Sequence, residues 1–183
     1  MKTLSVKDLM VPLNQYATVY EDATLSDAMD ALEKAQALFD QSRDRHRAIL
    51  VCEKKTGKVM GKISQLDVIR SLEPKYNLLG EKQSLGRMGF SPHFMKSMLD
   101  HYELWHDPLE DICKKAGKLK VTEVMYKLTE GEYVREDSGL NEAVHQLVMG
   151  HHQSLLVRRG EEIVGILRLT DIFRKICDAR KKC

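Results

Sequence analysis

Two glycine-led segments contain the residues best suited to bind a small molecule: GKISQLD at 61–67 and GILRLTD at 165–171. In the first, a strand pattern passes into a helix pattern at Ser64. Free N–H groups at a helix N-terminus and the helix dipole both favour phosphate. Asp67 lies one turn further on, and the two oxygens of its carboxylate suit the vicinal hydroxyls of a ribose. The same spacing is also a capping box, which begins many helices that bind no ligand.

The second segment departs from the first, because Arg168 stands at the position of Ser64. A guanidinium can bond a phosphate through two parallel N–H groups, and it can equally pair with a carboxylate and fill the space. Thr170 could then cap the helix in place of the serine. The region around Asp171 is therefore expected either to bind a different ligand or to be closed.

The remaining residue patterns argue against catalysis and against a metal centre. His151 and His152 are adjacent and cannot both face one metal from a regular strand, and no HExxH pattern occurs. The sequence has no P-loop, no GxGxxG, no GxSxG and no Cys/His nucleophile arrangement. We expect no catalytic residues, no metal ligands and no enzyme activity.

Composition narrows the class of protein further. The 29 Lys and Arg residues nearly balance the 27 Asp and Glu residues, which argues against binding nucleic acid through a broad basic surface. No stretch approaches the roughly 20 consecutive apolar residues of a membrane helix, and the first residues contain no apolar core of a secretion signal. The four cysteines form no CxxC pair. We expect a cytoplasmic protein with reduced thiols.

One pattern occurs twice along the chain. Met10 and Met125 close two similar openings, VKDLM and VTEVM, and lie 115 positions apart; Leu25 and Leu140, which begin the next amphipathic stretches, have the same separation. The two closing aspartates are 104 apart, because the first copy is longer in two polar, turn-rich stretches. Repeat 1 is thus expected to span 1–72 and repeat 2 to span 121–183, with an insert at 73–120.

Each repeat predicts the order helix, strand, helix, strand, strand, helix. In repeat 1, strands are predicted near 17–19, 48–51 and 59–63, and a closing helix over 65–72. Thr24 and Asp27 form a capping box before the first long helix. The apolar stripe predicted along that helix is Leu25, Ala28, Met29, Leu32 and Ala35. The fold class is therefore α/β of the α+β type, each repeat having a three-stranded sheet and two helices that need the other copy to bury their apolar surface.

The insert matches neither repeat. Pro74 and the glycines after it predict a loop at first. A helix with one apolar face is predicted from Ser91 onward, and such a face is typical of core or dimer packing. Its apolar residues are Phe94, Met95, Met98, Leu99, Tyr102 and Trp105. A further helix is predicted to begin with Asp107 as its cap and to end at Gly117.

Each copy resembles a CBS domain (the cystathionine-β-synthase type), and the pair resembles the tandem CBS or Bateman module. The features that carry the resemblance are the Val-x-x-Val/Leu-Met opening, the Thr/Ser-Leu signal before the helix, and the closing Gly-hydrophobic-hydrophobic-Ser/Thr-x-x-Asp signature. The resemblance implies two copies packed through their sheets about a pseudo-twofold axis. It also implies two clefts that bind AMP, ADP, ATP or another adenosyl compound in many relatives, and a disc-shaped dimer.

In the family, each cleft combines the closing Asp of one copy with entry-strand residues of the other copy. Register alone assigns such residues here. The candidate ligand-binding residues are Ser64, Asp67, Lys127 and His152 in the first cleft, and Ala17, His46, Arg168, Thr170 and Asp171 in the second.

Two functions follow from the resemblance. The first is a stand-alone regulatory module, a homodimer that binds an adenine nucleotide as its regulatory ligand and signals by conformational change to a partner enzyme or transporter. The alternative is a ligand-free pair that serves as a dimerisation or docking scaffold, which Arg168 and the insert favour. Neither hypothesis involves a covalently bound cofactor, a membrane or nucleic acid.

Overall fold

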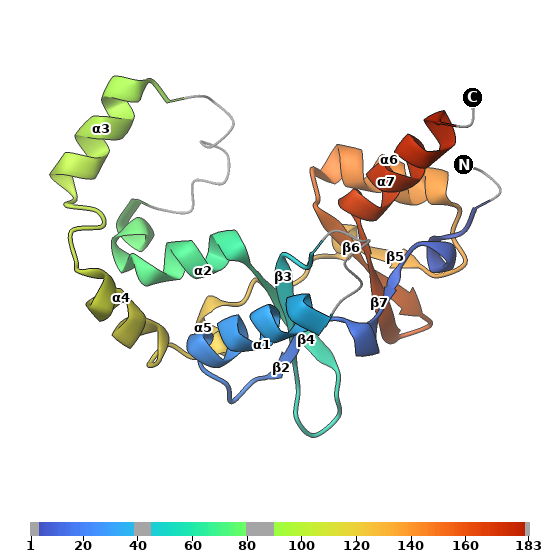
Figure 1. Cartoon of the computed structure of the whole chain (residues 1–183), viewed down its shortest axis with the longest axis horizontal. Helices are drawn as coiled ribbons and strands as arrows, with labels where there is room; N and C mark the ends of the chain where they lie inside the picture. Colours follow the sequence, from blue (N-terminus) through green and yellow to red (C-terminus); the bar gives the residue numbers. More distant parts are fainter. Residues whose placement is uncertain (1–3, 39–44, 80–89, 182–183) are drawn as a thin grey trace.

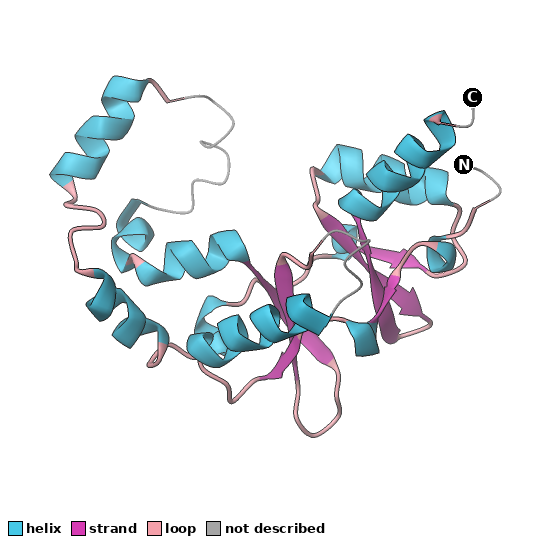
Figure 2. Ribbon diagram, in the orientation of Figure 1, coloured by secondary structure: helices cyan, strands magenta, loops and turns pink. Residues whose placement is uncertain are grey.

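The computed structural model describes residues 4–38, 45–79 and 90–181, and it places the two repeats side by side with a sheet in each (Figures 1 and 2). The sheet of repeat 1 has the order β2-β3-β4, with β2 (Thr18–Tyr20) parallel to β3 (Ala48–Cys52) and β3 antiparallel to β4 (Val59–Ser64). The predicted strands and the mixed α+β class are confirmed for this repeat.

The sheet of repeat 2 has four strands, not the three predicted. Its order is β1-β7-β6-β5, with β5 (Tyr133–Arg135), β6 (Ser154–Arg159) and β7 (Glu162–Arg168) repeating the pattern of the first sheet. The extra strand, β1 (Val11–Pro12), comes from the opening of repeat 1 and pairs antiparallel with β7. The prediction was wrong because a repeat in the sequence does not say which copy a segment packs against.

The helices and short turns complete both repeats. Repeat 1 has α1 (Leu25–Leu38) and α2 (Gln65–Leu72), and repeat 2 has α6 (Leu140–Gly150) and α7 (Leu169–Arg180). The insert contributes α3 (Pro92–His101) and α4 (Leu109–Ala116), and α5 (Val121–Val124) opens repeat 2. The 3₁₀ turns are η1 (Val6–Asp8), η2 (Leu13–Gln15), η3 (Pro74–Leu79) and η5 (Glu130–Glu132). No helix in these described ranges is both long enough and apolar enough to span a membrane.

Strand alternation divides the apolar residues among three cores. On β3, Ile49 and Val51 face α1 in the core of repeat 1, whereas Leu50 faces the other sheet. On β6, Leu155 faces the core of repeat 2 and Leu156 meets the same inter-sheet core. Because successive side chains of a strand point to opposite faces, each sheet is buried on both sides. The two repeats are therefore joined through their sheets.

The opening segments of the two repeats are exchanged. Val121 of α5 is fully buried in the core of repeat 1, and Val6 of η1 is fully buried in the core of repeat 2. Matching backbone hydrogen bonds fix the exchange: the Leu25 N–H donates to the Leu119 carbonyl at 2.8 Å, and Leu140, 115 positions later, donates to Leu4 at 2.9 Å. In Figure 1 the N-terminal segment accordingly runs beside repeat 2.

The glycine that begins each closing segment permits this crossing. A Cβ atom on Gly61 would lie 2.8 Å from the Tyr126 carbonyl oxygen, and one on Gly165 would lie 2.6 Å from that of Val11. Both obstacles are backbone atoms of the exchanged segments, so they cannot rotate away as a side chain could. The glycines are required by close approach of the main chain.

The capping box of α1 is present, because the Asp27 N–H donates to Thr24 Oγ1 at 3.2 Å while the Thr24 N–H donates to Asp27 Oδ2 at 2.8 Å. Leu25, Ala28 and Leu32 of the predicted stripe are buried, and Ala35 packs partly against them. Met29 is exposed, so including it in the buried stripe was wrong.

The insert packs on repeat 1 through α4, whose Ala116 is buried in the core of repeat 1, and internal contacts hold its two ends together just after α2. The buried Glu73 carboxylate accepts a hydrogen bond from the Trp105 N–H at 2.7 Å, and the Trp105 indole N–H donates to the Tyr76 hydroxyl at 3.1 Å. Pro74 begins the turn η3 rather than a loop, whereas the predicted glycines at 80, 86 and 89 lie outside the described residues.

The helices of the insert agree in part with expectation. Ser91 caps α3 by accepting a hydrogen bond from the Phe94 N–H at 3.2 Å, so the helix begins next to its predicted start. No residue of α3 is buried, so its apolar face does not belong to a core of the chain as the structure describes it. Asp107 is not the cap of α4: its carboxylate pairs with Lys115, and Pro108 holds the cap position, while Gly117 ends the helix as predicted.

We expect Gly61→Ala and Gly165→Ala each to lower the free energy of unfolding by about 1–3 kcal/mol, because the added Cβ would press on backbone carbonyls. Urea unfolding followed by circular dichroism measures the change. Gly117→Ala is the matched control, since its Cβ would meet nothing closer than the Lys114 carbonyl at 3.7 Å and its φ of −69° is helical. Equal stability of all three variants would contradict the role given to the two glycines.

Candidate functional site

The first candidate site lies where β4 ends and α2 begins. The Asp67 N–H donates to Ser64 Oγ at 3.2 Å, while the Ser64 N–H and hydroxyl donate to Asp67 Oδ2 at 2.8 and 2.5 Å. The capping box is therefore real and engages one carboxylate oxygen. The other, Oδ1, has no hydrogen bond from the described residues, and Asp67 is only half-buried. One oxygen of this carboxylate thus remains available to an incoming donor.

Repeat 2 contributes a buried acidic residue, Glu132, to the contact between the repeats near this site. Its carboxylate, 3% exposed, forms a salt bridge with Lys62 of β4, whose side chain is 17% exposed. The Thr129 N–H donates to the second carboxylate oxygen at 3.1 Å. Glu132 lies 115 positions after Ala17, so an acid in repeat 2 takes the place of a small residue in repeat 1. Sequence reasoning missed Glu132 and Lys62, although applying the 115-residue offset at Ala17 would have found the first.

The pKa of Glu132 is lowered, because its partners stabilise the charged carboxylate more than burial destabilises it. Burial works to raise the pKa of the carboxyl, but the hydrogen bonds from Lys62 and Thr129, with the charge of Lys62, hold it below its ordinary value. The carboxylate is therefore charged at neutral pH, and the salt bridge ties repeat 1 to repeat 2.

Lys127 and His152, the other residues assigned to this cleft by register, lie on the repeat 2 side. His152 is half-buried; its ring packs over Gly150, and the His152 charge also lowers the pKa of Glu132. Lys127 is exposed and follows Tyr126, whose N–H donates to the Lys62 carbonyl at 2.9 Å. The described structure gives neither residue a hydrogen bond or ion pair with Asp67. They border the contact between the repeats, where the Lys127 ammonium and the His152 imidazole could bind an anion.

The second candidate site is filled by a buried salt bridge. Arg168 donates from Nε to Asp171 Oδ2 and from Nη2 to Oδ1, both at 2.6 Å, and the two side chains are only 5% and 4% exposed. Of the two alternatives for Arg168, the structure has the pairing with a carboxylate. Both oxygens of Asp171 are engaged, in contrast to the single oxygen engaged at Asp67.

The same guanidinium reaches repeat 1. Arg168 Nη1 lies 3.3 Å from His46 Nδ1, and His46 Nε2 lies 3.1 Å from the Gln15 carbonyl oxygen. Because arginine only donates, Nδ1 must accept and Nε2 must carry the proton, which fixes a neutral tautomer. The Tyr16 ring contacts the imidazole edge-on at 4.4 Å, and burial raises the pKa of this tyrosine to about 12. Contacts from Asp171 through Arg168 and His46 to the Gln15 carbonyl thus join repeat 2 to repeat 1.

The capping role considered for Thr170 needs correction, and Ala17 stays an untested prediction. Thr170 does not cap α7, because Arg168 holds the cap position and Thr170 already lies inside the helix. Ala17 is buried with its side chain in the core of repeat 1. Only His46 of the residues taken from repeat 1 reaches the Arg168–Asp171 pair through a hydrogen bond that the structure defines.

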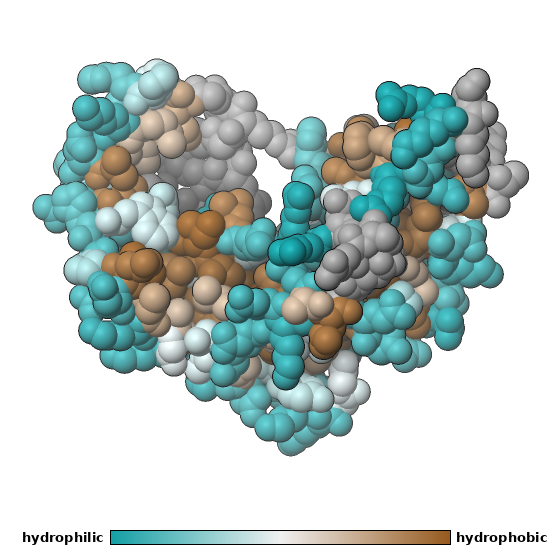
Figure 3. Space-filling view, viewed as in Figure 1, coloured by the Kyte–Doolittle hydropathy of each residue, from teal (hydrophilic) through white to brown (hydrophobic). Residues whose placement is uncertain are grey.

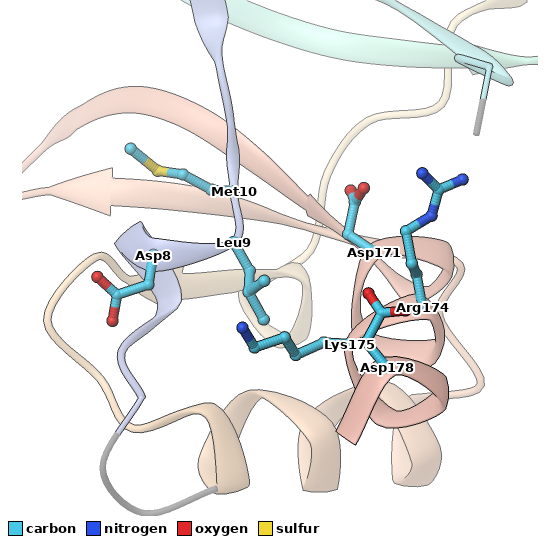
Figure 4. A pocket seen from close by; sticks show the side chains of 7 residues that line it. All are labelled: Asp8, Leu9, Met10, Asp171, Arg174, Lys175 and Asp178. Atoms are coloured by element: carbon cyan, nitrogen blue, oxygen red, sulfur yellow. The ribbon is translucent and has the colours of Figure 1, made fainter. Parts of the chain in front are cut away.

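A pocket of about 180 Å³ lies beside the second site, between η1 and α7 (Figure 4). Its lining residues are Asp8, Leu9, Met10, Asp171, Arg174, Lys175 and Asp178. Its volume is below the roughly 300–1,000 Å³ that small-molecule sites usually enclose. No group of three or more metal-ligating side chains occurs in the described ranges.

Comparison with protein families and structures gives a consistent result. The family model described as "CBS domain" matches residues 6–74 and 121–178. A search of curated proteins gives no significant match. Among solved structures, CBSX2 in complex with AMP is 16% identical with a TM-score of 0.58, covering 96% of this chain and 98% of that chain.

Two further structures show the same fold. The CBS domain of a bacterial CNNM/CorC family Mg²⁺ transporter in complex with ATP is 11% identical with a TM-score of 0.59, covering 96% of this chain and 89% of that one. Protein MJ1004 from Methanocaldococcus jannaschii is 19% identical with a TM-score of 0.59; the match covers 96% of this chain but only 60% of that longer chain.

The depressed pKa of Glu132 predicts an acid-sensitive contact between the repeats. Its contribution to the free energy of unfolding is complete above the unfolded value of 4.5 and is lost as the pH falls through the lower folded value. We therefore expect Glu132→Gln to be less stable than the wild type at pH 7 and the two to converge as the pH falls below 4.5.

Urea unfolding over a pH series measures this convergence. Asp137→Asn is the control, because its pKa is also lowered by a hydrogen bond, from Arg135, but that pair is exposed and screened by solvent. A constant difference between the wild type and Glu132→Gln at every pH would contradict the assignment.

Proposed function

The chain belongs to the CBS domain family, and from this premise we propose that it is a regulatory CBS-pair module that binds an adenine nucleotide between its repeats. The proposed ligand is AMP, ADP or ATP, and the proposed site is the cleft that contains Ser64 and Asp67. The module has no catalytic role of its own in this proposal; it acts on an enzyme or transporter.

The observation that carries the proposal is the state of Asp67. Its Oδ1 has no hydrogen bond from the described residues, while Oδ2 is held in place by Ser64 at the N-terminus of α2. A fixed carboxylate with one open oxygen can accept hydrogen bonds from ribose hydroxyls. Lys127 supplies a positive charge and His152 an imidazole N–H donor for phosphates. The AMP and ATP complexes formed by proteins of the same fold support this class of ligand.

Signalling follows from the way the repeats are joined. The Asp67 carboxylate belongs to repeat 1, whereas Glu132, Lys127 and His152 belong to repeat 2, so a ligand between them would contact both. A ligand shifts an equilibrium between arrangements only if it binds one of them more tightly. Binding that draws Asp67 and repeat 2 together would therefore change the relation of the two halves.

We expect AMP, ADP or ATP to raise the melting temperature of the full chain, by the equivalent of about 2.7 kcal/mol at a concentration of 100 Kd. Asp67→Ala should abolish this rise, since it removes the acceptor for the ribose. Thermal-shift and calorimetric titrations with the three nucleotides and S-adenosylmethionine measure both effects.

Asp27→Ala is the matched control. Thr24 and Asp27 form the same capping box, with the same N–H distances of 2.8 and 3.2 Å, on a helix outside the proposed cleft. Both variants lose one helix cap, but only Asp67→Ala should lose the ligand response. If neither the wild type nor Asp27→Ala responds to any adenosyl compound at millimolar concentration, the proposed function is wrong.

The buried Arg168–Asp171 pair favours a second function, a ligand-free scaffold for dimerisation or docking. A ligand-free scaffold would need both of its clefts to be closed by the chain itself. Absence of any ligand response together with a stable dimer would favour this alternative.

We further propose that the module is a homodimer. Ile69 on α2 and Phe173 on α7 occupy equivalent positions, 104 residues apart, and are 53% and 66% exposed. Apolar surface over α2 and the insert is visible in Figure 3. Apolar residues exposed at matching places in a pseudo-symmetric chain suit a twofold contact with a second copy.

Ile69→Asp and Phe173→Asp should each shift the sedimenting species from dimer towards the 21.0 kDa monomer. Sedimentation velocity over a range of protein concentrations measures this shift. Met149→Asp on α6 is the control, because that side chain is equally exposed, at 68%, on another helix. A wild type that is already monomeric at every concentration would contradict the homodimer.

A further inference from the structure

We propose that Arg168 is a built-in occupant of the second cleft, so that each chain binds a single nucleotide and keeps its other cleft closed by its own side chain. The inference rests on the function proposed for the Asp67 cleft, which it restricts to one of the two symmetry-related positions.

The evidence begins with the two signature aspartates, which are equivalent by register. Asp67 has one oxygen engaged, by Ser64, and is half-buried. Asp171 has both oxygens engaged, by two parallel N–H groups of Arg168 at 2.6 Å, and is 4% exposed. A ribose could bind Asp171 only after a buried, bidentate cation had been removed from it.

The guanidinium also has the right shape to replace a ligand. Its Nε–H and Nη2–H are two donors side by side, as two vicinal hydroxyls are, and they approach the carboxylate in the same forked manner. The third nitrogen, Nη1, extends to His46 of repeat 1 at 3.3 Å. One side chain therefore does what a bound nucleotide would do: it binds the closing Asp of one repeat and contacts the other repeat.

The neutral imidazole of His46 connects the Arg168 guanidinium to the main chain of repeat 1. His46 Nε2 lies 3.1 Å from the Gln15 carbonyl, in the segment between β1 and β2 where register places the ligand-facing entry residues. His46 itself is fully buried. Opening the second cleft would break the Arg168 contacts to both Asp171 and His46, so the closed state is held from both repeats.

The neighbouring pocket does not restore a site. It includes Asp171 and measures about 180 Å³, but the oxygens of Asp171 are already bonded to Arg168. The charged residues of its lining include Asp8 and Asp178 as well as Arg174 and Lys175, so it presents no net positive charge to phosphates. The module is thus asymmetric in function although its fold is nearly symmetric.

The test is calorimetric titration of the full chain with AMP and with ATP, comparing the wild type with Arg168→Ser. The serine recreates the S-x-x-D box seen at Ser64 and Asp67, which gives Asp171 two new donors and leaves one oxygen open. We expect the stoichiometry to rise from one ligand per chain in the wild type to two in Arg168→Ser. Arg168→Lys, which keeps a cation beside Asp171, is expected to remain at one.

The reciprocal variant keeps the inference testable if Arg168→Ser does not fold. Ser64→Arg places the same side chain opposite Asp67 with His152 at the position equivalent to His46, so it should close the first cleft and eliminate binding. Ser64→Ala is its control, since losing the hydroxyl alone should weaken binding but leave it saturable. Binding by Ser64→Arg that is as tight as that of Ser64→Ala would overturn the inference.

The outcomes separate this inference from the proposed function. Two ligands per wild-type chain, or a folded Arg168→Ser that binds no more than the wild type, would overturn the role of Arg168. A wild type that binds nothing while Arg168→Ser binds one ligand would disprove the function proposed for the Asp67 cleft and support the closure by Arg168.

Discussion

The close approach of main chain to main chain at Gly61 and Gly165 is the constraint on which the rest of the molecule depends. Because neither residue has a Cβ, the exchanged segments can lie against β4 and β7 with carbonyl oxygens where side chains would otherwise stand. The exchange in turn supplies Val121 to the core of repeat 1 and Val6 to the core of repeat 2. Neither repeat has a complete core without the other, so the contact between the repeats, near which both candidate sites lie, depends on the pairing.

The two candidate sites differ through two charged residues that break the internal symmetry. Glu132 stands where repeat 1 has Ala17, and it is neutralised by Lys62 across the contact. Arg168 stands where repeat 1 has Ser64, and it is neutralised by Asp171 within its own repeat. In both cases a buried charge has a partner, as burial in a medium of low dielectric requires. The difference is that the first pair leaves the signature Asp67 available, whereas the second engages the signature Asp171 itself.

Much of the fold could be predicted from the sequence, because strand alternation, capping boxes and a constant offset of 115 residues are local or periodic signals. The helix over 65–72 and the box of Thr24 and Asp27 agree with the structure for that reason. Such signals could not predict the exchange of opening segments, because the sequence pattern of an opening segment is the same whichever repeat the segment packs against. The state of Arg168 was left as two alternatives because a guanidinium suits phosphate and carboxylate equally. The contact between Lys62 and Glu132 spans 70 residues and has no signature of its own.

Helix α2 connects the candidate site at Asp67 to the insert. Asp67 lies in its first turn. Glu73, the residue that follows its last turn, accepts a hydrogen bond from the Trp105 backbone N–H. Eight residues of helix make a rod of about 12 Å, stiff on the scale of a side-chain movement. The contact with Trp105 therefore lies at the end of α2 opposite to the candidate site, and α3 stands away from the two sheets in Figure 1. The surroundings of Trp105, the single tryptophan, are thus connected through Glu73 to the helix that carries Asp67.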